Sequence, residues 1–315
     1  MSGNKRLLIT GGLGNAGLWL TEYFVQQGFE VAVLTRKSKG LAIEAKVQLI
    51  EADISSQESI QQALKNQVFE YVIHLASVNE IFLDNYPEIA LKVNTWGTRN
   101  LLQSLDKSAL KNFIYFSTVH VYGLASGTID ESTPVLPRHD YATTHYFAEK
   151  YVEQFHKTHQ LPYTIFRLTN GYGAPKDINS SKWRLILNDL AKMAFEQQKI
   201  ELKSNGKALR DFIWLGDICR IVHQIINLSE SPNKVFNLGS SHTKSMLDIA
   251  QQVQKAYQDQ FGQFIPIEVN TKDQTQATAL TVNCDRLKAL VPYQVQEKVY
   301  DEILAVFDLL QARKS

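Results

Sequence analysis

A glycine-rich turn near the start of the chain joins a short apolar run to an amphipathic segment, and few folds accommodate that order. The run Leu7–Thr10 leads directly into Gly11, Gly14 and Gly17, and apolar residues then recur at helical spacing as far as Gly28. Gly11 permits a tight turn, Gly14 lets the backbone approach a pyrophosphate, and Gly17 allows the helix to pack closely on the strand. Because a helix N-terminus attracts anions, this turn predicts a dinucleotide site.

Short apolar runs alternate with longer amphipathic ones through the first half of the chain. Buried strands are expected where the runs are rich in β-branched or aromatic residues, at Leu7–Thr10, Val31–Thr35, Val47–Glu51, Tyr71–Leu75, Phe113–Ser117 and Tyr163–Arg167. Helices are expected at Gly17–Gln27, Ser56–Asn66, Ile89–Leu105 and Tyr141–His159. This alternation predicts an α/β fold with a Rossmann-like, doubly wound parallel sheet and helices on both faces.

The alternation of short apolar runs with longer amphipathic runs ends after Arg167, and we expect a smaller second domain there. The expected elements are a helix at Arg184–Gln197, a strand–turn–strand around Asn205-Gly206, and helices near Ser245–Phe261 and Glu297–Ala312. The chain is expected to cross back to the sheet at Arg210–Leu238. The predicted dinucleotide-binding domain is therefore 1–168 plus 209–238, and the predicted substrate-binding domain is 169–208 plus 239–315.

Composition excludes several classes of protein. Of the 315 residues, 44% are hydrophobic and 21% are charged, which suits a chain with a sizeable core. A net charge of +1 gives no electrostatic reason to expect nucleic acid or an anionic membrane as a partner. No apolar run approaches the ~20 residues that span a bilayer, and the start is too short for a signal peptide. Cys219 and Cys284 make neither a disulfide framework nor a metal cluster, so we expect a cytoplasmic protein.

The end of the second strand bears on which dinucleotide binds. NAD sites usually carry an acidic residue there, whereas NADP sites carry an arginine for the 2′-phosphate. This strand ends in Thr35, Arg36 and Lys37, without a carboxylate. We therefore predict NADP, with NAD as the alternative if Arg36 and Lys37 are ordinary surface cations. Asp53 is expected either to accept the adenine amino group or to cap the following helix.

Motifs along nearly the whole chain carry a family resemblance. They are the turn at 11–17, His74-Leu75-Ala76-Ser77, Asn94-Thr95-Trp96-Gly97-Thr98, Ser117-Thr118-Val119-His120-Val121-Tyr122-Gly123, Arg167-Leu168-Thr169-Asn170-Gly171-Tyr172-Gly173, Arg210-Asp211-Phe212-Ile213 with Asp217, and Asn237-Leu238-Gly239 followed by Ser245. With them the chain resembles the extended short-chain dehydrogenases/reductases of the NAD(P)-dependent epimerase/dehydratase family, which act mainly on nucleotide sugars. The resemblance implies a cofactor-binding set of Gly11, Gly14, Asn15, Ala16, Gly17, Arg36, Asp53, Ile54, Leu75, Ala76, Ser77, Asn94, Tyr141 and His145.

The resemblance also implies a catalytic set. In that family, the tyrosine of a YxxxK motif is the acid/base, and a Ser or Thr hydroxyl positions the sugar oxygen. Tyr141 and Thr118 match these positions. Hydride transfer at a carbinol or ketone carbon needs a proton moved at the adjacent oxygen, and a phenol beside the nicotinamide ribose can move it.

His145 is the main departure from the family pattern. The family's lysine stands at this position, one helical turn after the tyrosine, where its charge favours the phenolate and its amine holds the ribose. Histidine can donate to the ribose, but with an ordinary pKa near ~6.5 it is largely neutral at pH 7. Three hypotheses remain: a working variant in which His145 is catalytic, a slowed enzyme, and a dinucleotide-sensing protein without turnover.

Val119 and His120 bear on the type of reaction. The family's 4,6-dehydratases carry an Asp-Glu pair directly after the hydroxyl, and GDP-fucose-synthase-like members carry a Cys first. Val119-His120 therefore disfavours both chemistries and leaves a 4-ketoreductase or a C4 dehydrogenase, with a 4-epimerase as the alternative. His120 is either a further acid/base or sugar contact, or a structural group.

The implied substrate is a nucleotide-diphosphate sugar. In relatives the arginine at Arg210 contacts the diphosphate, where guanidinium geometry is bidentate. The alternative for Arg210 is an ion pair with Asp211 or Asp217. The substrate-binding set comprises Thr118, Val119, His120, Asn170, Arg210 and Arg286. Helices Ile89–Leu105 and Tyr141–His159 resemble the pair that forms a dimeric four-helix bundle in the family, so a homodimer is expected.

Overall fold

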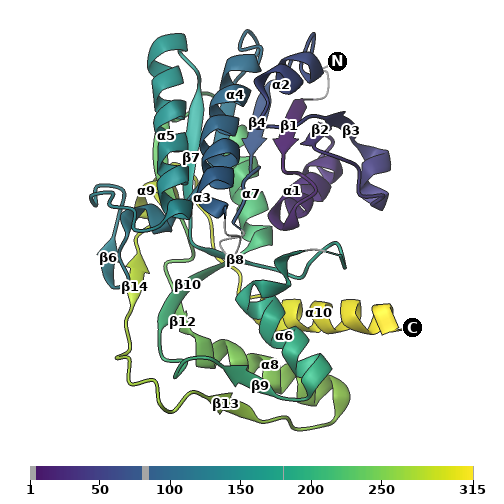
Figure 1. Cartoon of the computed structure of the whole chain (residues 1–315), viewed down its shortest axis with the longest axis vertical. Helices are drawn as coiled ribbons and strands as arrows, with labels where there is room; N and C mark the ends of the chain where they lie inside the picture. Colours follow the sequence, from purple (N-terminus) through teal and green to yellow (C-terminus); the bar gives the residue numbers. More distant parts are fainter. Residues whose placement is uncertain (1–4, 80–84, 180, 315) are drawn as a thin grey trace. The chain divides into compact units, whose positions relative to one another are not determined.

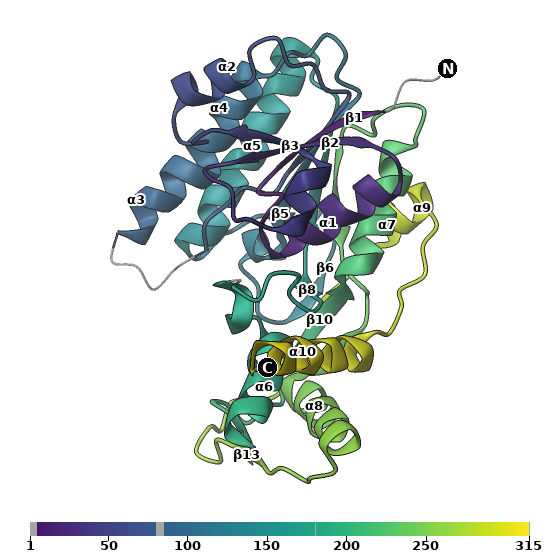
Figure 2. The same cartoon turned by 90° about the vertical axis from the view of Figure 1, so that its right-hand side faces the viewer.

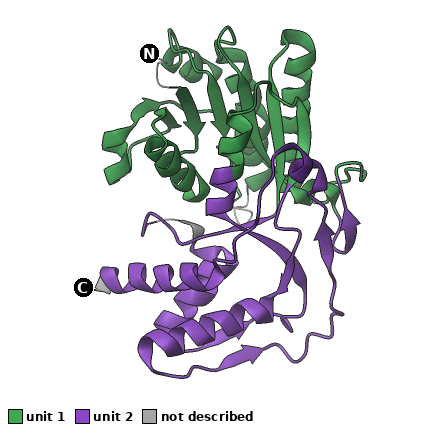
Figure 3. Cartoon of the chain, turned by 180° about the vertical axis from the view of Figure 1, so that it is seen from behind, with its two compact units in different colours: residues 1–123, 131–168, 221–237 green, residues 124–130, 169–220, 238–315 purple. Residues whose placement is uncertain are grey.

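The computed structural model describes residues 5–79, 85–179 and 181–314, and the chain divides into two compact units (Figure 3). Unit 1 comprises residues 1–123, 131–168 and 221–237; unit 2 comprises residues 124–130, 169–220 and 238–315. The first four residues, where no signal peptide is predicted, lie outside the described ranges. Within those ranges, no helix has both the length and the apolar character that crossing a bilayer requires.

Unit 1 is built on a seven-stranded sheet of order β11-β7-β5-β4-β1-β2-β3 (Figure 1). Every strand pair from β7 to β3 is parallel. The strands are β1 (Arg6–Thr10), β2 (Glu30–Thr35), β3 (Gln48–Glu51), β4 (Tyr71–His74), β5 (Asn112–Thr118), β7 (Tyr163–Leu168) and β11 (Lys234–Leu238). All six predicted strands are confirmed. The strand order reverses direction between β1 and β4, the place where open α/β sheets bind ligands.

Helices cover both faces of this sheet, as predicted. In Figure 2, α2 (Gln57–Ala63), α4 (Gly97–Ser104) and α5 (Asp140–His159) lie on one face, and α1 (Asn15–Gln26) lies on the other. The segment predicted as one helix at Ile89–Leu105 consists of α3 (Tyr86–Ala90), the π-helical turn η2 (Leu91–Trp96) and α4. Buried side chains of α2, α4 and α5, such as Ile60, Leu101 and Val152, form one apolar core with the sheet.

Unit 2 has a core of three helices. They are α6 (Ile186–Gln197), α8 (Met246–Phe261) and α10 (Val299–Lys314), and all three predicted helices are confirmed. Ala191, Val253 and Phe307 are fully buried where these helices pack together. The remaining elements are β6 (Gly127–Ile129), β8 (Asn170–Tyr172), η4 (Ser181–Arg184), β9 (Ile200–Leu202), β10 (Leu209–Trp214), β12 (Thr243–Ser245), β13 (Ile267–Val269), β14 (Leu280–Val282) and α9 (Asp285–Leu290).

The predicted strand–turn–strand around Asn205-Gly206 is confirmed by β9 and β10, and these two strands do not pair with each other. β9 pairs with β13, whereas β10 pairs with β8 and β12. The Asn205 side chain donates to the carbonyls of Asp273 and Thr275 at 3.1 and 2.8 Å. A distant segment therefore holds the turn, and β9 and β10 on either side of it pair with other strands.

The observed units differ from the predicted division at two segments and at residue 238, which begins the last segment of unit 2. Residues 209–220 belong to unit 2, because β10 lies in the three-stranded sheet of that unit. Residues 124–130 also belong to unit 2, because β6 pairs with β14. Both assignments depend on strand pairing between segments far apart in the sequence. The helix α7 (Leu215–Ile226) carries the chain from unit 2 back into unit 1.

Candidate active site

The glycine turn packs backbone against backbone. Gly11 has φ +70°, and a Cβ atom there would lie 2.9 Å from the amide nitrogen of Ala76. A Cβ atom on Gly17 would collide with the carbonyl oxygen of Gly11. The amide of Gly14 donates to that same oxygen at 2.9 Å. A side chain at Gly11 would therefore displace the turn from the segment that follows β4, and a side chain at Gly17 would displace the turn from α1.

The N-terminus of α1 is open to an anion. Its first turn has no side-chain cap and no acidic residue, and the amides at the start of a helix have no partner within it. In the described part of the chain, the Oδ1 atom of Asn15 is buried without a hydrogen-bond partner. The backbone amides of Asn15, Ala16 and Gly17 are donors at the positive end of the helix dipole, and they fit the pyrophosphate of a dinucleotide.

The residues predicted around the adenosine occupy different environments. Arg36 is exposed directly after β2, and Ile54 is buried. Asp53 is exposed, and its Oδ1 accepts from the amide and the hydroxyl of Ser55 at 2.9 and 2.8 Å. The cap of α2 is Ser56, whose hydroxyl oxygen accepts from the amide of Ser59. The capping alternative for Asp53 is therefore wrong, because Asp53 stabilises the turn that precedes the helix.

Asn94 organises the loop after β4. Its Oδ1 accepts from the amide of Val78 at 2.8 Å, and its Nδ2 donates to the carbonyl of Val78 at 3.2 Å and to Oγ1 of Thr144 at 3.1 Å. Both ends of the amide are thus used inside unit 1. Ala76 donates its amide to Oγ1 of Thr10 at 3.3 Å, while Leu75 is half-buried and Ser77 is exposed. This loop brings the predicted segment 75–77 beside the glycine turn.

Thr118, Tyr141 and His145 come together in unit 1. Thr118 ends β5 and is buried, and Tyr141 lies in the first turn of α5, where Nδ1 of His139 accepts from the amide of Ala142. The rings of Tyr141 and His145 are 4.5 Å apart between centroids and meet edge to face. Burial raises the pKa of Tyr141, and a side-chain hydrogen bond with Thr118 opposes that rise.

His120 approaches the same tyrosine from the turn after β5. Its ring lies 6.2 Å from that of Tyr141 between centroids, and the ring is solvent-exposed. Val119 beside it is buried. One exposed imidazole and one buried apolar side chain therefore follow the Thr118 hydroxyl.

His145 is uncharged in this environment. It is 3% exposed, and its Nδ1 lies 2.7 Å from the hydroxyl oxygen of Tyr115, with which it forms a hydrogen bond. Its Nε2 is buried without a partner among the described residues. Burial, with a smaller contribution from His120, lowers the pKa of His145 to about 3. The contact with Tyr115 was not predicted from sequence, because nothing local relates residues 30 positions apart.

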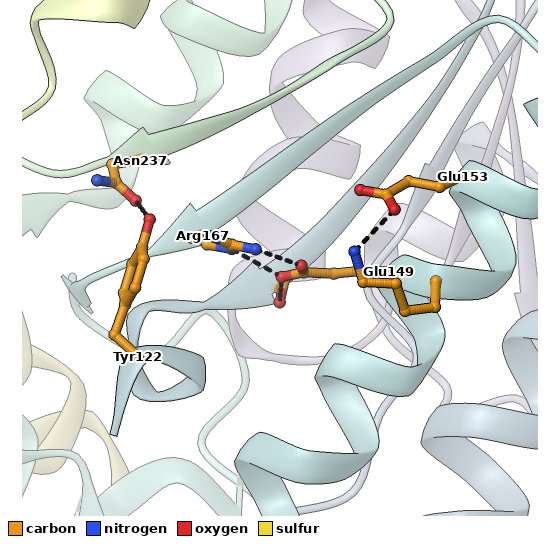
Figure 4. A network of polar contacts seen from close by, with 7 residues as sticks. Tyr122, Glu149, Glu153, Arg167 and Asn237 are labelled. Atoms are coloured by element: carbon orange, nitrogen blue, oxygen red, sulfur yellow. Dashed lines mark hydrogen bonds and ion pairs between the residues drawn. The ribbon is translucent and has the colours of Figure 1, made fainter. Parts of the chain in front are cut away.

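A buried ion pair supports this end of the sheet (Figure 4). Nη2 of Arg167 is 2.7 Å from Oε2 of Glu149, and Nε of Arg167 donates to Oε1 at 3.0 Å. The hydroxyl of Ser117 donates to the same carboxylate at 2.5 Å. The guanidinium lies over the ring of Tyr122, whose hydroxyl donates to Oδ1 of Asn237 at 2.7 Å. This ion pair was not predicted from the sequence, where its one signal was the position of Glu149 one helical turn after His145.

The predicted substrate residues Asn170, Arg210 and Arg286 belong to unit 2. Nδ2 of Asn170 donates to the carbonyl of Asp211 at 2.8 Å, which joins β8 to β10. Arg210 on β10 and Arg286 on α9 are both exposed.

The ion-pair alternative for Arg210 is wrong. Oδ1 of Asp211 accepts from the hydroxyl of Thr169 and the amide of Ser240, both at 2.8 Å. Asp217 instead pairs with Arg220, one helical turn further along α7. Both carboxylates point into unit 2, whereas the side chain of Arg210 faces solvent.

Acid is expected to destabilise the chain through two buried histidines. His74 bonds the hydroxyls of Thr10 and Thr98 through its two ring nitrogens, and burial lowers its pKa to about 3, as for His145. In the unfolded chain both groups titrate near ~6.5. The unfolded state therefore binds more protons below that pH, and the free energy of unfolding falls from about pH 6.5 toward pH 3. Each histidine contributes about 1.4 kcal/mol per pH unit.

Urea unfolding between pH 5.5 and 4.5 tests this expectation. The slope of the unfolding free energy against pH should be shallower by about 1.4 kcal/mol per pH unit in His145→Gln than in the wild type. His242→Gln, at an exposed position, should keep the wild-type slope. Equal slopes in all three proteins would mean that His145 is not buried in its neutral form.

The sheet order and the glycine turn are those of dinucleotide-binding α/β proteins. A family model described as "NAD dependent epimerase/dehydratase family" matches residues 7–239. The chain therefore belongs to the NAD-dependent epimerase/dehydratase family, as its motifs predicted.

Individual relatives are distant. The chain is 23% identical over 322 residues to a UDP-glucose 4-epimerase of Lactobacillus helveticus, covering 95% of each chain. It is 27% identical over 279 residues to a dTDP-D-glucose 4,6-dehydratase of Dictyostelium discoideum, covering 79% of this chain and 61% of the relative. The fold is similar to that of UDP-glucuronic acid 4-epimerase from Bacillus cereus in complex with UDP-glucuronic acid and NAD. That similarity has a TM-score of 0.82 at 21% identity, over 98% and 99% of the two chains.

Proposed function

We propose that the chain is an NAD(P)-dependent oxidoreductase acting at C4 of a nucleotide-diphosphate sugar, as a 4-ketoreductase or a C4 dehydrogenase. The observation that supports it most directly is the contact of Tyr141 with both Thr118 and His145. Tyr141 is the acid/base: its phenol gives a proton to the C4 oxygen on reduction, and its phenolate takes the proton of the C4 hydroxyl on oxidation. The hydride chemistry is supplied by the dinucleotide when it is bound.

The other two side chains have distinct parts in this proposal. Thr118, buried at the end of β5, holds the same sugar oxygen and keeps the phenol of Tyr141 from an even higher pKa. His145 contributes a neutral ring nitrogen instead of the ammonium usual in the family, so it contacts the dinucleotide without adding charge. Dehydration would need a further acid/base pair, and the buried Val119 cannot supply a proton.

A 4-epimerase is the second candidate. It needs no group beyond Tyr141, Thr118 and the dinucleotide. It is favoured by the similarity to the 4-epimerases of Lactobacillus helveticus and Bacillus cereus. In an epimerase, a bound dinucleotide would supply hydride transfer in both directions, and Tyr141 and Thr118 would act on the same C4 oxygen each time.

We propose NADP as the dinucleotide. Arg36 is exposed directly after β2, where a 2′-phosphate would lie, and no carboxylate ends that strand. The nearby carboxylate of Glu44 accepts from the amides of Lys39 and Leu41 at 2.8 and 3.1 Å, so it belongs to its own loop. NAD, which is present in the Bacillus cereus structure, is the competing outcome.

The sugar nucleotide is proposed to bind through unit 2. Arg210 is exposed and forms no ion pair with Asp211 or Asp217. Its guanidinium is therefore available for bidentate contact with a diphosphate. Asn170 and Arg286 are the further candidates. UDP, GDP, CDP or dTDP should raise the melting temperature if one of them is the substrate's nucleotide, because binding to the folded state stabilises it.

Release of any bound dinucleotide tests the proposal. The protein is purified without added cofactor and denatured, and the supernatant is analysed by mass spectrometry and by absorbance of reduced nicotinamide. A stoichiometric dinucleotide would favour the epimerase or a tightly coupled dehydrogenase, and its mass would distinguish NADP from NAD. An empty protein that binds NADPH would favour the ketoreductase. An empty protein that binds neither dinucleotide would overturn the proposal.

We propose further that the chain is a homodimer through the helices η2 and α5. Leu91, Trp96 and Phe147 on these helices are 46%, 47% and 45% exposed, an unusual group of large apolar side chains in contact with water. Trp96→Glu is expected to convert the dimer to a monomer in sedimentation velocity, because a charge would be buried at the interface. Phe264→Glu, at a more exposed position in unit 2, should remain dimeric. A monomeric wild-type protein would contradict the proposal.

A further inference from the structure

The imidazole of His145 is held on one side and unpartnered on the other. Its Nδ1 lies 2.7 Å from the hydroxyl oxygen of Tyr115, which belongs to β5. Its Nε2 is buried, and no hydrogen-bond partner for it lies among the described residues. Both side chains are nine-tenths or more buried, with exposures of 3% each. A buried, unsatisfied ring nitrogen beside Tyr141 is costly, and so it indicates a missing partner.

Counting protons decides which tautomer this contact selects. If Nδ1 carried the proton, Tyr115 would accept it, and both the hydroxyl proton of Tyr115 and the lone pair at Nε2 would remain unsatisfied. If Nε2 carries the proton, the hydroxyl of Tyr115 donates to Nδ1, and Nε2–H is the donor left over. The second arrangement leaves fewer unsatisfied groups in a buried site. The tautomer of a histidine is commonly set in this way, by the partner of its other nitrogen.

The surroundings keep this ring neutral. Tyr115 from β5 and Tyr141 from α5 are phenols, and burial raises the pKa of both. His74 from β4 is itself buried in its neutral form, and His120 from the turn after β5 opposes a positive charge on His145. The carboxylate of Glu149, which also acts on Tyr115, is paired with Arg167. A neutral ring presents one donor with a fixed direction.

We propose that Tyr115 is a positioning residue that fixes His145 as its Nε2–H tautomer, so that this buried N–H donates to a ribose hydroxyl oxygen of the bound dinucleotide. The proposal rests on the proposed function, because it requires a dinucleotide beside Tyr141. A lysine at position 145 would need no such partner, since an ammonium has three equivalent protons that rotate toward any acceptor. A histidine must be set in one tautomer, and the phenol of Tyr115 is placed to set it.

Nitrogen NMR of the cofactor-free protein tests the tautomer. The protein is labelled with ¹⁵N-histidine, and the His145 signals are assigned by their loss in His145→Gln. Between pH 6 and pH 8 we expect a protonated Nε2 and an unprotonated Nδ1 in the wild type, and a mixture of tautomers in Tyr115→Phe. Tyr122→Phe is the control, because it removes an equally buried phenol that donates to Asn237 instead. A protonated Nδ1 in the wild type, or an unchanged spectrum in Tyr115→Phe, would overturn the proposal.

A double-mutant cycle on dinucleotide affinity tests the second part of the proposal, the contact of His145 with the dinucleotide. Tyr115→Phe should weaken binding by about fivefold in the wild-type background, the effect of one weakened hydrogen bond. In the His145→Ala background the same change should alter Kd by less than about twofold, because Tyr115 acts through His145. Equal weakening in both backgrounds would assign Tyr115 a general structural role and overturn the proposal.

The two measurements separate the possible failures. If the wild type shows the Nε2–H tautomer but binds no dinucleotide, the proposed function fails, and the ligand part of this proposal fails with it. If dinucleotide binds while Nδ1 is protonated, the proposed function stands and the role of Tyr115 is wrong. The wild-type spectrum alone decides the tautomer, even if Tyr115→Phe does not fold.

Discussion

Tyr141→Phe is expected to lower kcat by at least ~10²-fold while leaving the Kd for dinucleotide within about threefold. Phenylalanine keeps the aromatic ring against His145, so packing in the first turn of α5 is preserved. It removes the hydroxyl that hydrogen-bonds with Thr118, and with it the proton that must move at the sugar oxygen. Loss of turnover with retained binding separates a chemical role from a structural one.

Steady-state kinetics and fluorescence titration of NADPH check this prediction together. Tyr146→Phe is the matched control, because that phenol lies five residues further along α5 and contacts Lys150 instead of the candidate site. The control should keep kcat within about twofold. Turnover of Tyr141→Phe at the wild-type rate would remove Tyr141 from the acid/base role and leave the dinucleotide site without an assigned chemistry.

Glu149→Ala is expected to reduce the free energy of unfolding by about 3–5 kcal/mol, the usual cost of breaking a buried ion pair. The carboxylate is fully buried and the guanidinium of Arg167 is 5% exposed, so the alanine variant leaves a cation without its partner inside unit 1. The hydroxyl of Ser117 loses its acceptor as well. A loss of this size lowers Tm by on the order of 10 °C in a domain of 150–250 residues.

Chemical denaturation measures this effect, and Figure 4 contains its control. Glu153 pairs with Lys150 at 2.8 Å, but that ion pair faces solvent, so Glu153→Ala should cost less than about 1 kcal/mol. The double variant Glu149→Leu/Arg167→Met removes both buried charges and should be more stable than Glu149→Ala. A Glu149→Ala protein as stable as Glu153→Ala would show that water reaches the buried pair.

Predictions from the sequence succeeded where the signal is local. The six strands were predicted because buried parallel strands are short, apolar and rich in β-branched residues, and the glycine turn because only glycine fits Gly11 and Gly17. Helix α5 and its Tyr141–His145 spacing follow from the 3.6-residue period, which places both side chains on one face. The family follows from motifs that each lie within a few consecutive residues.

The sequence did not predict which side chains from distant segments contact each other. Tyr115 meets His145, and Arg167 meets Glu149, because the register of β5 and β7 under α5 brings those side chains together. The pairing of Asp217 with Arg220 is different, because these two residues are three positions apart on α7 and their contact is local. Periodicity reports which face of an element is buried, whereas a contact between elements depends on sheet order, register and helix packing, which many residues determine jointly. That is why the sequence pointed to His145 as an unusual residue, and the folded chain supplied the phenol that holds it.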